Sequence, residues 1–76
     1  MKIDKTIDTT GLLCPLPILR TAQAVKEIKA GETLEILATD PGIKEDIKNW
    51  CTMTGHELID IVDQDDKIIV HLKKSS

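Results

Sequence analysis

Residues 11–19 read GLLCPLPIL, and in this stretch a strand pattern changes into a helix pattern. Before it, apolar and polar residues alternate over residues 3–9, which predicts a strand with one buried face. Over residues 15–30, apolar residues return every three or four positions, which predicts an amphipathic helix that stops before Gly31. The stretch therefore joins a strand to a helix and places a cysteine at the junction.

The rest of the chain continues the alternation of strands and helices. We expect a strand in the interior of the sheet, a helix, and two strands joined by a polar hairpin, at residues 33–39, 41–54, 57–62 and 67–72. Residues 73–76 are expected to be a frayed tail. Right-handed crossovers place both helices on the same side. The sequence thus predicts a two-layer α/β (α+β) sandwich of order βαβαββ, with a four-stranded mixed sheet and two helices on one face.

The composition is that of a small globular chain. Its 76 residues are 41% hydrophobic and 30% charged, so we expect residues 1–76 to form a single domain. A formal net charge of -3 and an aromatic content of 1% argue against a direct nucleic-acid partner. No apolar run could span a membrane and no secretory signal follows Met1, which favours the cytoplasm and no membrane partner.

Both predicted helices begin with a residue followed by proline. Proline is favourable at the first helical position, and the residue before it is then the N-cap, usually Ser, Thr, Asp or Asn. Asp40 follows this rule. Cys14 does not, because a neutral thiol is a weak hydrogen-bond acceptor, whereas a thiolate is a better one. Since a residue that breaks a local rule is a candidate for function, we predict that Cys14 is the reactive residue.

The neighbours of Cys14 predict a rigid corner. Pro15 and Pro17 restrict the backbone on its helical side. Leu13 is expected to pack on Ile18 as a hydrophobic staple that fixes the direction of the chain. The corner would present the sulfur in one place.

The start of a helix also predicts a lowered pKa for Cys14. The N–H of Leu16 is expected to point at the sulfur, but two prolines remove donors and Asp40 would oppose ionisation, so the lowering should be moderate. No histidine or lysine lies within a few residues, and no general base is evident. A reactive thiol without catalytic apparatus suits a carrier that accepts a group from one protein and gives it to another.

The remaining cysteine and the histidines point to structure. Cys51 shares the apolar stripe of the second predicted helix, so a buried position is expected. His56 is expected at the opposite edge of the sheet from Cys14, and His71 is expected to be exposed on its strand. The two cysteines form no CxxC pair, so we expect no disulfide. The two cysteines and two histidines contain no pairs at the short spacing of zinc ligands, so we expect no metal site.

Three segments carry a resemblance to a known family: DTTGLLCPLPIL (8–19), GETLEILATDPGIKEDIKNWC (31–51) and TGHELI (54–59). They resemble the TusA/SirA-like sulfur-carrier proteins over nearly the whole chain. The most specific element is Cys-Pro-x-Pro at 14–17, and Asp46 agrees in spacing. The resemblance implies a sandwich like the C-terminal domain of bacterial translation initiation factor three, with strand order 1-2-4-3 and the last strand antiparallel to the rest.

The resemblance also implies sulfur transfer. The cysteine that matches Cys14 would accept sulfane sulfur as a persulfide from a cysteine desulfurase or a rhodanese and pass it to an acceptor protein. Pro15, Leu16, Pro17 and Asp40 are the expected supporting residues. The chain itself would need no metal or bound cofactor, since PLP would belong to the donor.

The family serves more than one pathway: thiolation of the tRNA wobble uridine, molybdenum-cofactor assembly and sulfur oxidation. Members of the tRNA-thiolation type often have Glu where this chain has Leu16. An apolar residue beside the sulfur suits a different docking surface. A monomer is expected for a carrier that must dock twice.

A second hypothesis keeps the reactive thiol without sulfur transfer. The protein would be a thiol-based redox or regulatory binding module, whose cysteine forms a sulfenic acid or a mixed disulfide. Such a module usually has a resolving cysteine nearby, and Cys51 is expected to be buried. An RNA-binding module is a third hypothesis, opposed by the acidic balance of the chain.

Overall fold

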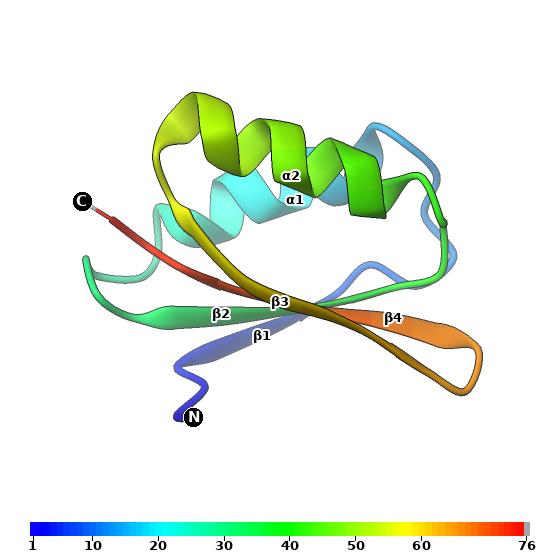
Figure 1. Cartoon of the computed structure of the whole chain (residues 1–76), viewed down its shortest axis with the longest axis horizontal. Helices are drawn as coiled ribbons and strands as arrows, with labels where there is room; N and C mark the ends of the chain where they lie inside the picture. Colours follow the sequence, from blue (N-terminus) through cyan, green and yellow to red (C-terminus); the bar gives the residue numbers. More distant parts are fainter. Residues whose placement is uncertain (76) are drawn as a thin grey trace.

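The computed structural model describes residues 1–75, and within this range it contains four strands and two helices (Figure 1). Along the chain they are β1 (Lys5–Asp8), α1 (Leu16–Val25), β2 (Thr33–Ala38), α2 (Ile43–Thr54), β3 (Glu57–Gln64) and β4 (Lys67–Lys73). The strand order in the sheet is β1-β2-β4-β3. β1 and β2 are parallel, and β4 is antiparallel to both of its neighbours, so the mixed sheet and its order are as expected.

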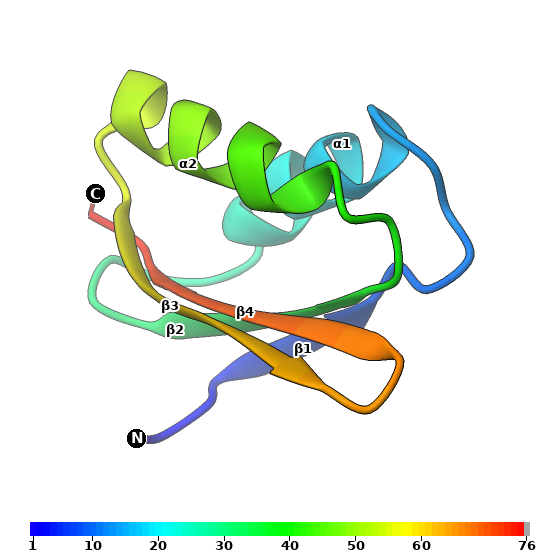
Figure 2. The same ribbon diagram turned by 45° about the vertical axis from the view of Figure 1, so that its right-hand side comes forward.

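Both helices cover the same face of the sheet. Figure 1 and Figure 2 show α1 and α2 above the strands, with no helix from residues 1–75 on the other face. β2 lies between β1 and β4, which explains why the centre of its sequence is almost continuously apolar. The predicted two-layer sandwich is confirmed. Within residues 1–75, neither helix has the length and apolar character that a membrane span requires.

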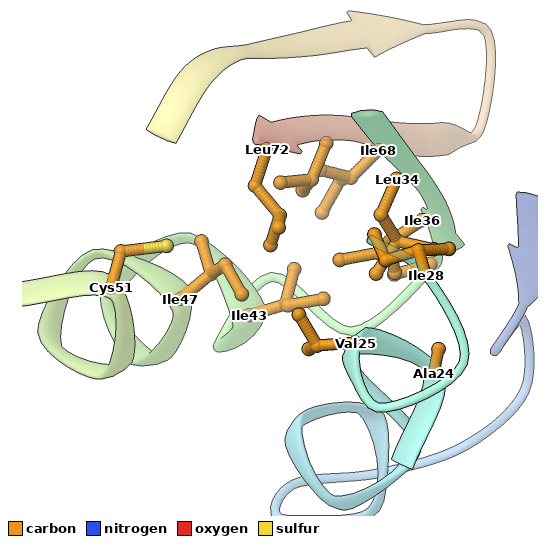
Figure 3. Packing of buried hydrophobic residues seen from close by; sticks show 12 residues of the cluster. Ala24, Val25, Ile28, Leu34, Ile36, Ile43, Ile47, Cys51, Ile68 and Leu72 are labelled. Carbon is orange, nitrogen blue, oxygen red and sulfur yellow. The ribbon is translucent and has the colours of Figure 1, made fainter. Parts of the chain in front are cut away.

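The hydrophobic core fills the space between the helices and the sheet (Figure 3). Burial of this apolar surface is the main favourable term in folding. The side chains come from α1 and the turn after it, from α2, and from the two central strands: Ala24, Val25, Ile28, Leu34, Ile36, Ala38, Ile43, Ile47, Cys51, Ile68, Val70 and Leu72. Cys51 is 4% exposed, so the buried position predicted for it is confirmed.

The first helix is shorter than predicted. It ends at Val25, and the chain then tightens: the N–H of Glu27 donates to the carbonyl of Ala24 at 2.9 Å, and that of Ile28 to Val25 at 3.4 Å. These are bonds between residues three apart, the spacing of a 3₁₀ turn. Ile28 remains buried, at 7% exposure. The apolar periodicity therefore placed Val25 and Ile28 in the core correctly, although Leu19, which shares the helical spacing, is 54% exposed and the helix itself stops five positions before Ala30.

The C-terminal tail is not frayed over its described part. Lys73 belongs to β4, and the backbone of Lys74 bonds in both directions, donating to Glu32 at 3.0 Å and accepting from Gly31 at 2.7 Å. Ser75 donates its hydroxyl to the carbonyl of Gly55 at 2.6 Å. These hydrogen bonds attach the tail to the segments that follow the two helices. The polar residues of the tail gave no sign of these contacts in the sequence. Ser76, the last residue of the predicted tail, lies outside the described residues.

The hairpin is tighter than predicted. β3 continues to Gln64, so the turn consists of Asp65 and Asp66 rather than four polar residues. Asp65 has a φ of 57°, the left-handed conformation that two-residue hairpin turns require and that Asp tolerates well.

A polar row crosses the uncovered face of the sheet. Thr6, Glu35, His71 and Asp60 are register partners on β1, β2, β4 and β3. Nε2 of His71 lies 2.9 Å from Oε2 of Glu35, and Nδ1 lies 2.6 Å from Oδ1 of Asp60. The His71 side chain is only 14% exposed, so the expected exposed position is wrong. The alternation placed it on the outer face correctly, but two carboxylates enclose it there.

These contacts favour the charged form of His71. Burial opposes charging, but hydrogen bonds to Glu35 and Asp60, together with their charges, outweigh it and raise the pKa of His71. With a carboxylate at each ring nitrogen, the imidazolium donates two hydrogen bonds and ties three strands together.

This network predicts a pH dependence of stability. Because the pKa of His71 is higher in the folded chain than the unfolded value of 6.5, its stabilisation is complete below that value and is lost as pH rises through the folded pKa. We expect the Tm to fall as pH rises above about 6.5, and His71→Gln to reduce that fall. His56→Gln is the control, since the contacts of the His56 ring within residues 1–75 are with Trp50 and the N–H of Ser75, not with a carboxylate. An equal fall in wild type and His71→Gln would contradict the prediction.

Candidate functional site

The site lies where the β1–α1 and β2–α2 loops meet, at the same end of the molecule in Figure 1 and Figure 2. The hydroxyl of Thr9 donates to the carbonyl of Leu37 at 2.7 Å, and the N–H of Gly11 donates to the hydroxyl of Thr39 at 2.9 Å. The carboxyl ends of parallel strands share one edge of a sheet, and ligands commonly bind there. The loop that carries Cys14 is thus fixed against the loop that carries Asp40.

Asp40 joins the starts of the two helices. Its Oδ2 accepts from the N–H of Cys14 at 2.9 Å, and its Oδ1 accepts from the N–H of Gly42 at 3.1 Å. These two hydrogen bonds lower the pKa of Asp40 and favour its ionised form. α2 begins at Ile43 rather than at Pro41, with Gly42 as the formal N-cap. The prediction that Asp40 caps this helix is therefore wrong, because no side chain caps α2 and the contact of Asp40 with Gly42 lies in the loop before it.

The predicted cap at Cys14 is wrong. α1 begins at Leu16, its N-cap is Pro15, and no side chain caps it. The N–H of Leu16 donates to the carbonyl of Leu13 at 2.9 Å and not to the sulfur. Leu13 is 71% exposed, so the expected staple with Ile18 is not formed. The N–H of Leu16, which the sequence analysis expected to point at the sulfur, is used in a backbone turn instead.

The sulfur of Cys14 contacts a carboxylate instead. Its exposed thiol donates to Oδ2 of Asp46, on the first turn of α2, with Sγ and Oδ2 2.7 Å apart. This hydrogen bond is the largest of the causes that raise the pKa of Cys14. Partial burial and the negative charges of Asp46 and Asp40 raise it further. The predicted lowering of the pKa is therefore wrong. Helix-end donors do not face the sulfur, and acidic groups do.

A shallow apolar groove opens beside the thiol. Its volume is about 260 Å³, and it lies between α1 and α2, lined by Cys14, Pro15, Ile18, Asp46, Asn49, Trp50 and Met53. Leu16 is 46% exposed and Met53 is 82% exposed, so both side chains present apolar surface to solvent. Of the expected supporting residues, Pro15 lines the groove, Leu16 is exposed on the first turn of α1, and Pro17 is buried beneath that turn.

Other candidate residues lie away from the thiol. His56 follows the C-terminal end of α2, where its ring lies 5.3 Å from that of Trp50 and its Nδ1 accepts from the N–H of Ser75. His71 is on the uncovered face of the sheet. Both cysteines are free, and within residues 1–75 no group of three or more His, Cys, Asp or Glu side chains is arranged to hold a metal ion.

Asp46 is the site residue that the pattern analysis missed. An acidic residue in the first turn of a helix is ordinarily explained by the helix dipole, so nothing in the periodicity singled it out. Its spacing from Cys14 agreed with the family resemblance, which was the one available signal. The contact between residues 32 positions apart requires the packing of α2 beside the cysteine loop.

The fold and the site define a class: a small α+β protein with one exposed and one buried cysteine. Comparison with known proteins identifies the family. Residues 5–74 match the family described as Sulfurtransferase TusA, and the chain belongs to this family.

Similar proteins come from several bacteria. The chain is 42% identical to YrkI of Bacillus subtilis over 74 residues, covering 97% of this chain and 99% of that protein. It is 36% identical to the sulfur carrier protein TusA of Pseudomonas fluorescens over 76 residues, covering 100% of this chain and 92% of that protein. A relative in Aquifex aeolicus is longer, and the chain spans 39% of its length at 37% identity.

A solved structure has the same fold. The crystal structure of a SirA-like protein from Desulfitobacterium hafniense matches with a TM-score of 0.82 and 23% identity, over 95% of this chain and 99% of that one. This likeness supports the architecture described above.

The double role of Asp40 predicts a local effect of its removal. Asp40→Ala deletes the acceptor of both the Cys14 and the Gly42 N–H groups. We expect the amide of Cys14 to exchange with solvent about tenfold faster or more, measured by NMR hydrogen exchange. Asp8→Ala is the control, because Asp8 accepts from Thr10 in the same loop without contacting Cys14. Unchanged exchange at Cys14 in Asp40→Ala would show that this carboxylate does not hold the loop.

Proposed function

We propose that Cys14 carries sulfur as a persulfide between a donor protein and an acceptor protein. Sulfur-carrier function follows from membership of the TusA family. The assignment to Cys14 rests on one observation: its thiol is exposed at the groove, whereas the thiol of Cys51 is buried in the core. A sulfur atom that passes between proteins must be accessible to both.

The reaction is thiol exchange in two steps. The Cys14 thiolate attacks the outer sulfur of a donor persulfide, the bond between the two donor sulfurs breaks, and the donor leaves as a thiolate. An acceptor thiolate then attacks the outer sulfur on Cys14, and Cys14 leaves as a thiolate. Electrons balance without an external oxidant or reductant. The residues that line the groove include no histidine or lysine to act as a general base, and the Asp46 carboxylate favours the thiol over the thiolate, so rate must come from the proximity that docking supplies.

The partners follow from this chemistry. The donor is a cysteine desulfurase or a rhodanese, and PLP, where it is used, belongs to the donor. The exposed Leu16 and Met53 beside the thiol fit apolar surfaces of the partners. Leu16 favours molybdenum-cofactor assembly or sulfur oxidation over tRNA thiolation. We place the protein in the cytoplasm, as a monomer in which residues 1–76 act as one unit.

The test is sulfur loading followed by intact mass. With a cysteine desulfurase and cysteine, we expect wild-type protein to gain one sulfur atom that reductant removes, and Cys14→Ser to gain none. Cys51→Ala is the matched control and should load within about twofold of wild type, because its side chain is buried away from the groove.

Two outcomes would contradict the proposal. If Cys14→Ser still loads sulfur, another residue carries it. If wild-type protein gains no sulfur from a desulfurase or a rhodanese but is readily oxidised by peroxide at Cys14, the redox-module hypothesis replaces the carrier.

A further inference from the structure

We propose that Asp46 is a positioning residue that holds Cys14 as a thiol in the free protein, and that a Lys or Arg side chain of a docked partner releases it by pairing with Asp46. This inference rests on the proposed function and adds a regulation to the same site. The carboxylate of Asp46 keeps sulfur loading of the empty carrier slow until a partner docks.

The geometry requires a proton between the two groups. Oδ2 of Asp46 lies 2.7 Å from Sγ of Cys14, and a carboxylate can only accept. The thiol must therefore donate, and ionising it would place two acceptors with like charge in contact. That arrangement disfavours the thiolate.

No positive charge in the groove compensates. The charged groups that face the thiol are Asp46 on α2 and Asp40 in the β2–α2 loop, and both raise the pKa of Cys14. α1 contributes the uncharged Pro15 and Ile18, and the remaining lining residues on α2 are the uncharged Asn49, Trp50 and Met53. A cation at this place has to come from outside the groove.

Release is an exchange of hydrogen-bond donors. A partner Lys or Arg that donates to Asp46 replaces the S–H donor and neutralises the charge that opposed ionisation. The thiol proton then passes to solvent, and the thiolate attacks the outer sulfur of the donor persulfide. The partner thus activates the nucleophile at the moment when it brings the sulfur.

Asp46 keeps Cys14 protonated only in the carrier that has no sulfur bound. In the loaded form Sγ is bonded to the outer sulfur and has no proton, so it cannot donate to Asp46. An ionised outer sulfur is repelled by Asp46 and Asp40, which directs it away from the groove wall.

A partner cation can be imitated within the chain. Asn49 lines the groove and follows Asp46 by three positions on α2, the spacing at which helical side chains meet. Asn49→Arg places a guanidinium within reach of Asp46 without removing the carboxylate. Like Asp46→Asn, it should make Cys14 easier to ionise.

The experiment measures alkylation of Cys14 by iodoacetamide from about pH 6 to about pH 10. We expect Asp46→Asn to move the midpoint of the profile to lower pH and to raise the rate near pH 7 by about three- to tenfold, with a smaller rise in Asn49→Arg. Glu45→Gln is the matched control: Glu45 is also acidic and in the first turn of α2, but it is exposed and makes no contact with Cys14. Its profile should stay on that of wild type.

An unmoved profile, or a midpoint shifted to higher pH, in folded Asp46→Asn would overturn the proposal, as would equal shifts in Asp46→Asn and Glu45→Gln. Circular dichroism reports whether each variant folds. If Asp46→Asn does not fold, Asn49→Arg decides, and its failure to raise the alkylation rate contradicts the hold.

Release on docking has its own readout. With a desulfurase as donor, the ratio of loading rates between Asp46→Asn and wild type should be smaller than the ratio of their alkylation rates. Equal ratios would show that docking does not release the thiol. Shifted alkylation together with no sulfur loading in any variant would refute the proposed function while leaving the hold of Asp46 on the thiol in place, so the two failures are distinguishable.

Discussion

The site depends on one carboxylate, that of Asp40, which accepts from the backbones of two different loops. By binding the N–H groups of Cys14 and Gly42 it fixes the start of α1 relative to the start of α2. Asp46 then meets the sulfur because it lies one turn further along α2. The position of the thiol is therefore set by a hydrogen bond between loops as well as by the stiffness of the prolines beside it.

The electrostatics of the site are unusual for a reactive cysteine. Such residues commonly have a lowered pKa because of cations or helix ends, and here two carboxylates raise it. For an enzyme that acts alone, a raised cysteine pKa would be a disadvantage. For a carrier, a raised pKa is useful, since a protonated thiol resists oxidation and unwanted alkylation while no partner is bound. The charge that activates the sulfur is then part of the partner.

Local patterns in the sequence predicted the fold well and the site in part. Alternation and helical spacing identified buried residues such as Ile47 and Cys51, because burial against one sheet imposes those periods, although Leu19 has the same spacing and is exposed. The breach of capping preference at Cys14 is the local signal that predicts it as the reactive residue, and this stays a prediction, since the structure shows no side-chain cap at α1. The contacts of Cys14 with Asp46 and of His71 with Glu35 join residues far apart in sequence, so no local period encodes them. The pKa of Cys14 was misjudged for the same reason.

The most direct measurement follows a sulfur atom through the protein. Wild-type chain is loaded with sulfane sulfur, separated from the donor and mixed with an acceptor protein that has an accessible cysteine, and both are analysed by peptide mass mapping without reductant. We expect one extra sulfur atom on the peptide containing Cys14 before mixing, and the same atom on the acceptor cysteine afterwards, with Cys14 returned to a thiol. Sulfur found on Cys51, or sulfur that leaves Cys14 without reaching the acceptor, would contradict this expectation.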